Sequence, residues 1–110
     1  MASSIHLYGG RILINIAIVD NEKSVLENIR EILLNLSGEF KDVHIDTYEK
    51  AENFLVAFET TRYQILISDV DMPEINGIEM GKKARDRDPN IYIIFLTAYV
   101  EYAIESYRME

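Results

Sequence analysis

The chain has 110 residues, of which 48% are hydrophobic and 27% charged, a composition typical of one soluble globular domain. Its formal net charge of -8 argues against nucleic acid or an anionic membrane as the direct partner, because both are bound mainly by Lys and Arg. The chain contains no Cys, which excludes disulfides and thiolate metal sites, and no apolar run reaches the ~18 residues that suggest a membrane span.

The first ten residues read MASSIHLYGG and lack the basic and long apolar regions of a secretory signal. We expect residues 1–10 to be a leader or an expression remnant in which the two glycines form a flexible joint. The folded domain is then expected to span residues 11–110.

The first half of the domain predicts two strands and two helices. Residues 12–19 (ILINIAIV) are apolar and β-branched and end at Asp20, which indicates a buried strand. Apolar residues at helical spacing predict a helix over residues 25–36, and alternation predicts a strand near the sheet edge at 43–48. Residues 51–58 again have helical spacing.

The second half repeats the alternation. Residues 65–68 and 91–96 are apolar strands, residues 77–87 form a helix, and the apolar spacing from Val100 begins a fourth helix. Strands alternating with helices through short connections predict an α/β fold with a doubly wound parallel sheet.

Three polar residues end three of the predicted strands. Asp20 follows the first strand, Asp69 the third and Thr97 the fourth. In the doubly wound order 2-1-3-4 these ends lie on one edge of the sheet, where such folds bind ligands. A plainer interpretation is that Asp69 and Asp71 only begin a turn in SDVDMPEINGIEM, but the convergence of all three strand ends favours a site.

Three motifs carry a family resemblance: IVDNE at residues 18–22, ISDVDMPEING at 67–77 and FLTAY at 95–99. In this order the chain resembles the receiver domain of two-component response regulators, which has a flavodoxin- or CheY-like fold. The segment TAYVEYAIESY at residues 97–107 is most similar to the corresponding segment of receivers that carry a LytTR-type DNA-binding domain.

The resemblance implies a cytoplasmic signalling domain, not an enzyme, whose partner is a sensor histidine kinase. By the family pattern Asp69 is the phosphoacceptor, and the Thr97 hydroxyl and the Ala98 backbone N–H contact the phosphoryl group. The pattern implies Mg²⁺ held by Asp20, Asp69 and the backbone carbonyl of Asp71. The chemistry agrees, because two carboxylates ~4 Å apart repel by about 4 kcal/mol at an effective dielectric constant of ~20, which favours a bound divalent ion or a raised pKa.

Two positions depart from the family. Where receivers carry a second acid the chain has Asn21, so we expect weakened but not abolished Mg²⁺ binding. Asn21 is alternatively the N-cap of the first helix, and whether the Glu22 side chain replaces the acid stays open. The active-site lysine of the family has no counterpart, since Lys82 and Lys83 fall on a helix face that we expect to be solvated.

The other departure is the end of the sequence at Glu110, before the fifth strand and fifth helix of the family. We therefore expect the order 2-1-3-4 with that strand and helix missing. The strand at 91–96 would then be an open edge, and we expect self-association through it or through the fourth helix. Tyr99 and Tyr102 are candidates for such a dimer face, whereas Tyr107 is expected to pack in the core.

Two other functions stay open. The Asp69-Val70-Asp71 segment also resembles the D-x-D motif of haloacid-dehalogenase-like phosphatases, although Pro73 and its place on the third strand argue against that function. The second is a degenerate receiver that serves as an interaction module without phosphorylation, favoured by Asn21 and the missing lysine.

Gly77 is expected to adopt a backbone angle that other residues resist.

Overall fold

The structure is a computed structural model that describes residues 6–8, 11–37 and 41–96. The strands are β1 (His6–Tyr8), β2 (Arg11–Val19), β3 (Lys41–Tyr48), β4 (Ile65–Asp69) and β5 (Tyr92–Leu96). The helices are α1 (Lys23–Ser37), α2 (Ala51–Ala57) and α3 (Gly77–Arg87). The fourth helix predicted from Val100 and its tyrosines lie outside the described residues.

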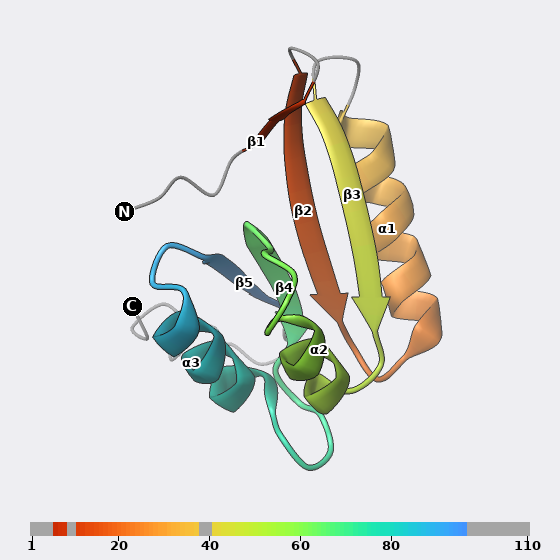
Figure 1. Ribbon diagram of the computed structural model, residues 1–110. Coiled ribbons are helices and arrows are strands. Elements are labelled where there is room, and N and C mark those ends of the chain that lie inside the picture. Colours follow the sequence, from red (N-terminus) through yellow and green to blue (C-terminus); the bar gives the residue numbers. More distant parts are fainter. Residues whose placement is uncertain (1–5, 9–10, 38–40, 97–110) are drawn as a thin grey trace.

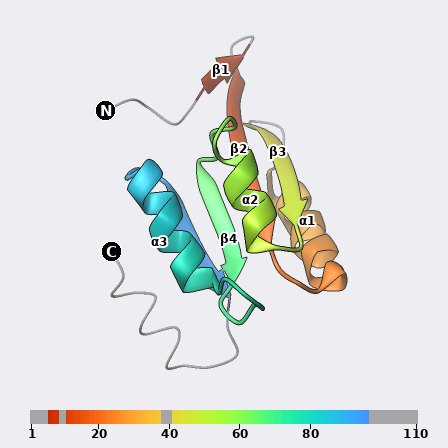
Figure 2. The same cartoon turned by 60° about the horizontal axis from the view of Figure 1, so that its bottom comes forward.

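The predicted parallel sheet is confirmed. β2 pairs in parallel with β3 on one side and with β4 on the other, and β4 pairs in parallel with β5. The spatial order of the four parallel strands is therefore β3-β2-β4-β5, which is the predicted 2-1-3-4. Helix α1 covers one face of this sheet, and α2 and α3 lie side by side on the other (Figures 1 and 2). This is the doubly wound arrangement expected from right-handed crossovers.

A short strand in the expected leader was not predicted. β1 pairs antiparallel with the start of β2, with Leu7 opposite Ile12. β4 begins its pairing with β2 only at Ile16, so the first residues of β2 have an edge that β4 does not reach. β1 supplies backbone partners there, while the boundary between residues 1–10 and 11–110 stays a prediction.

The two faces of the sheet carry separate apolar clusters. Under α1, the buried residues Ile16, Ile18 and Ile67 pack against Leu26 of the helix. The α2 and α3 face holds the larger cluster, whose buried residues are Ala17, Val19, Ala51, Phe54, Phe58, Tyr63, Leu66, Met72, Met80, Ala84 and Ile91. Alternation along β2 sends successive side chains to opposite faces, so one strand serves both clusters.

A hydrogen-bonded group lies where β3 borders the larger cluster. Tyr63 is 1% exposed. Its hydroxyl donates to Asp46 Oδ2 and lies 2.6 Å from the hydroxyl of Tyr48. The other carboxylate oxygen of Asp46 lies 3.1 Å from His44 Nε2. Burial is the main reason why the pKa of Tyr63 is raised above its usual value, so its hydroxyl keeps the proton that it donates.

The outer strand β5 exposes large apolar side chains. Tyr92 is 73% exposed, Ile94 49% and Leu96 36%. Their register partners on β4 include Ile65 and Ile67, so all three side chains project from the α1 face of the sheet. Within the described residues, β5 pairs with β4 alone. Among those residues no helix is long and apolar enough to cross a membrane.

Candidate functional site

The strand register places Asp20 beside Asp69. Val19 of β2 pairs with Ser68 of β4. Asp20 directly follows Val19 in the sequence, and Asp69 directly follows Ser68. Neighbouring strands lie ~4.8 Å apart, so the two aspartates leave the sheet as immediate neighbours at its carboxyl edge. The predicted convergence of these two strand ends is confirmed.

Backbone hydrogen bonds fix Asp20. Its N–H donates to the Tyr48 carbonyl of β3 over 3.0 Å, and its Oδ1 accepts from the Glu22 N–H over 2.8 Å. The residue is only 6% exposed. The Glu22 carbonyl accepts from the N–H groups of Val25 and Leu26 and so begins α1. Glu22, not the exposed Asn21, therefore occupies the N-cap position, which disfavours the capping alternative for Asn21.

Asp69 is partly buried at the end of β4, and its Oδ1 accepts a long hydrogen bond of 3.4 Å from the Asp71 N–H. Asp71 itself is exposed. This contact folds the chain after β4 back over the Asp69 carboxylate. The Asp71 carbonyl stays a prediction as a metal ligand.

Burial and neighbouring acidic side chains raise the pKa of both aspartates. Burial raises the pKa of Asp20, and the charges of Asp69 and Glu22 raise it further, against the lowering effect of the Glu22 N–H. Burial also raises the pKa of Asp69, with added contributions from Asp71 and Glu22 and opposing ones from backbone N–H groups. Because all these neighbours are anionic, the site favours a cation.

The donors suit magnesium better than a metal that needs many protein ligands. Among the described residues no Lys, Arg or His forms an ion pair with Asp20 or Asp69, although Asp20 is nine-tenths buried. Nor does this part of the chain hold three or more His, Cys, Asp or Glu side chains arranged around a metal. Mg²⁺ takes one or two carboxylates and completes its octahedron with water and other oxygens. Asp20 and Asp69 fit that requirement.

The loop after Asp69 is closed by Gly77, the first residue of α3. A Cβ on Gly77 would lie 2.0 Å from the Asp69 carbonyl oxygen and 2.8 Å from Ser68 Oγ. Ser68 is fully buried, and its hydroxyl donates to that same carbonyl over 2.7 Å. The unusual backbone angle predicted for Gly77 is instead found at Glu74, with φ 69°. Gly77 is thus required for a close approach between two backbone segments.

Other predicted positions have simpler outcomes. Lys82 and Lys83 are exposed on α3, as predicted. Thr97 and Ala98 lie outside the described residues, although Asp69 pairs with Leu96, which directly precedes them. The sequence interpretation overlooked the Ser68 hydroxyl, whose only signal was a polar residue at an otherwise apolar strand position.

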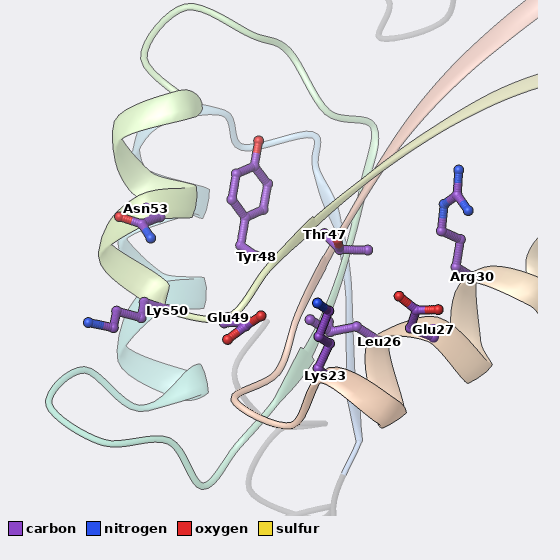
Figure 3. Close-up of a pocket in the computed structure, with 9 residues that line it drawn as sticks. All are labelled: Lys23, Leu26, Glu27, Arg30, Thr47, Tyr48, Glu49, Lys50 and Asn53. Atoms are coloured by element: carbon purple, nitrogen blue, oxygen red, sulfur yellow. The ribbon is translucent and has the colours of Figure 1, made fainter.

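A pocket of about 320 Å³ lies between α1, the end of β3 and the start of α2. Figure 3 shows Lys23 and Glu27 of α1 on one side of it and Asn53 of α2 on the other. Neither Asp20 nor Asp69 lines this pocket. The part of the carboxyl edge that holds Asp20 and Asp69, not this pocket, therefore remains the candidate functional site.

Comparison with protein families agrees with this geometry. The family model of the response regulator receiver domain matches residues 16–110. The chain belongs to the response regulator receiver domain family. As a receiver domain it is part of the two-component signalling class, as the motifs at residues 18–22, 67–77 and 95–99 predicted.

The curated relatives of this receiver domain are longer regulatory proteins. Sensory transduction protein LytT of Oceanobacillus iheyensis is 30% identical over 99 residues, which are 88% of this chain and 39% of LytT. Transcriptional regulatory protein LytR of Staphylococcus aureus is 30% identical and BtsR of Escherichia coli 35% identical, with 37% and 38% of their lengths covered. The chain thus spans about two fifths of the curated relatives it matches, and the LytTR-type resemblance is confirmed.

Solved receiver structures share the fold. The response regulator TrrA from Thermotoga maritima, in complex with Mg²⁺-BeF, is 33% identical with a TM-score of 0.76, over 87% of this chain and 80% of TrrA. CheY4 of Vibrio cholerae is 23% identical with a TM-score of 0.74, over 88% of this chain and 80% of CheY4. The predicted CheY-like fold is therefore confirmed.

Proposed function

We propose that this receiver domain takes a phosphoryl group from the phosphohistidine of a sensor histidine kinase onto Asp69, in a Mg²⁺-dependent reaction in the cytoplasm. The observation that carries the proposal is the parallel register that makes Asp20 and Asp69 neighbours at the carboxyl edge. A cysteine-free chain is compatible with a reducing compartment.

In this reaction an Asp69 carboxylate oxygen attacks the phosphorus of the phosphohistidine. The new O–P bond forms as the P–N bond breaks. The electron pair of the P–N bond returns to the imidazole nitrogen. Asp69 is suited to this role because it is partly buried and held from one side by the Asp71 N–H.

Mg²⁺ would be held by Asp20, Asp69 and the Asp71 carbonyl, and when bound it offsets the charge of the incoming phosphoryl group. The Asp20 backbone N–H donates to the Tyr48 carbonyl, and its carboxylate accepts from the Glu22 N–H, so the side chain is held in place. We assign Thr97 and Ala98 to phosphoryl contacts by the family motif, supported by their position directly after Leu96, the register partner of Asp69.

The test is incubation of the chain with phosphoramidate and MgCl₂, followed by intact mass measurement. We expect a gain of one phosphoryl group that is lost in Asp69→Ala and with EDTA. Asp86→Asn, which removes an exposed carboxylate on α3, is the matched control and should still be labelled. Labelling that persists in Asp69→Ala would rule out Asp69 as the acceptor.

The second candidate is a receiver that acts as an interaction module without phosphorylation. Asn21 favours it, because a neutral amide replaces an acid that the family uses for the metal. Failure of phosphoramidate to label the folded chain under saturating MgCl₂ would favour this candidate over phosphotransfer.

We also propose that the chain self-associates, either through the outer edge of β5 or through the helix expected after it. β5 has no charged residue among Tyr92–Leu96, whereas edge strands that stay unpaired commonly carry charges or Pro. Two copies of β5 paired antiparallel about Ile94 would bring Tyr92 opposite Leu96 of the second copy. All the exposed apolar side chains of both strands would then lie on one face.

A further inference from the structure

At the carboxyl edge, the acidic residue Glu22 directly follows the neutral Asn21. We propose that Glu22 supplies the negative charge that Asn21 lacks, acting on the bound Mg²⁺ through the water of its hydration shell. This inference rests on the magnesium site of the proposed function. It reassigns the second acid of the site from position 21 to position 22.

The backbone holds Glu22 close to the metal site. Its N–H donates to Asp20 Oδ1 over 2.8 Å. Its carbonyl accepts from Val25 and Leu26 over 3.1 and 3.2 Å, which anchors the residue to the first turn of α1. Glu22 therefore cannot move far from Asp20 without breaking the start of the helix. Its side chain is exposed to solvent, where hydrated ions are present.

The distribution of acidic residues points in the same direction. Glu22 is the acidic residue nearest to Asp20 in the sequence, and its N–H is hydrogen-bonded to the Asp20 carboxylate. Asn21, by contrast, has no charge to contribute and makes no hydrogen bond among the described residues.

An indirect role through water agrees with the arrangement of the side chains. The described residues contain no group of three acidic or histidine side chains placed to ligate one ion. Mg²⁺ loses its water reluctantly and keeps several molecules in protein sites. A carboxylate one water away stabilises the ion by accepting hydrogen bonds from that water, and loss of such outer-shell partners commonly lowers metal affinity by 10- to 100-fold.

The test is isothermal titration of the 110-residue chain and its variants with MgCl₂, without a phosphodonor. Glu22→Gln removes the charge but keeps the size of the side chain, and we expect it to weaken Mg²⁺ binding by about tenfold. The double variant Asn21→Asp with Glu22→Gln restores one acid to the pair and should return the affinity to within about twofold of the parent. Glu27→Gln, one turn further along α1, is the matched control and should bind like the parent.

The outcomes separate this inference from the proposed function. If the parent binds no Mg²⁺, the magnesium site of the proposed function is wrong and the inference falls with it. Tight binding by the parent that Glu22→Gln leaves unchanged would overturn the inference alone. Loss of affinity in Glu22→Gln without recovery in the double variant would also overturn it, because the effect would then not be one of charge. Far-ultraviolet circular dichroism of each variant checks that α1 is retained.

Discussion

Gly77 packs directly on the backbone of Asp69: a Cβ at this glycine would lie 2.0 Å from the Asp69 carbonyl oxygen and 2.9 Å from its carbonyl carbon. The Gly77 N–H also donates to the Val70 carbonyl over 2.9 Å, so the start of α3 is fastened to the end of β4. The atom that Gly77 approaches belongs to the main chain, which has little freedom to move aside. The position of the candidate phosphoacceptor therefore depends on a residue eight positions further along the chain.

Gly77→Ala should accordingly destabilise the domain. The added methyl group overlaps backbone atoms, and overpacking of this kind costs about 1–3 kcal/mol of unfolding free energy or more. Urea denaturation followed by circular dichroism measures the loss. Lys82→Ala, an exposed change further along the same helix, should leave the midpoint nearly unchanged. A Gly77→Ala midpoint equal to that of the parent would contradict the close approach.

Asp20→Asn should stabilise the ion-free protein near neutral pH. The pKa of Asp20 is raised from 3.8, mainly by burial and next by neighbouring charges, so the folded chain binds this proton more tightly than the unfolded chain does. The resulting stability is fully present below pH 3.8 and is lost as the pH rises through the raised pKa. An asparagine carries no charge and avoids that loss while its Oδ1 can still accept from the Glu22 N–H.

This prediction is checked by urea unfolding in EDTA across a pH series. The difference between Asp20→Asn and the parent should be largest near neutral pH and should shrink toward about pH 3. With MgCl₂ the order should reverse, because a ligand that binds only the folded parent stabilises it by about 1.4 kcal/mol at tenfold excess over Kd. Equal stability of the two proteins at all pH values would be inconsistent with a raised pKa for Asp20.

Tyr63→Phe should lower the unfolding free energy by about 1–2 kcal/mol, because it removes the hydroxyl that donates to Asp46 and leaves the ring in place. The ring itself packs against Phe54 and Phe58, with centroid distances of 5.9 and 6.4 Å. Thermal or urea unfolding measures the change. Tyr92→Phe on the exposed side of β5 is the control, with no expected effect.

Ile94→Lys should weaken self-association roughly tenfold if the outer edge of β5 is the interface, since it puts two like charges opposite each other at the centre of the paired strands. Sedimentation velocity over a concentration series gives the dissociation constant. Val56→Lys, which changes an apolar residue on α2 that is 66% exposed, is the control. Since each copy carries a net charge of -8, association of the parent should strengthen with added salt. A parent that stays monomeric at high concentration and high salt would exclude this interface.

The sequence by itself determined the order and type of the elements of the parallel core. Apolar β-branched runs such as residues 12–19 and helical spacing such as that of residues 25–36 are local signals, and local signals are readable without knowing the partners. The turn residues between Asp69 and Gly77 and the order of the three motifs were sufficient to predict the family and the fold.

Tertiary structure alone decided the relationships between distant residues. β1 has too short and mixed a sequence to predict, and it forms because β4 leaves part of the edge of β2 open. The role of Gly77 was wrongly predicted, because a steric contact with Asp69 leaves no mark on the glycine's own sequence neighbours. The placement of Glu22 likewise depends on how α1 starts against Asp20. Periodicity reports the faces of each element, whereas register and close approach arise only when the elements pack.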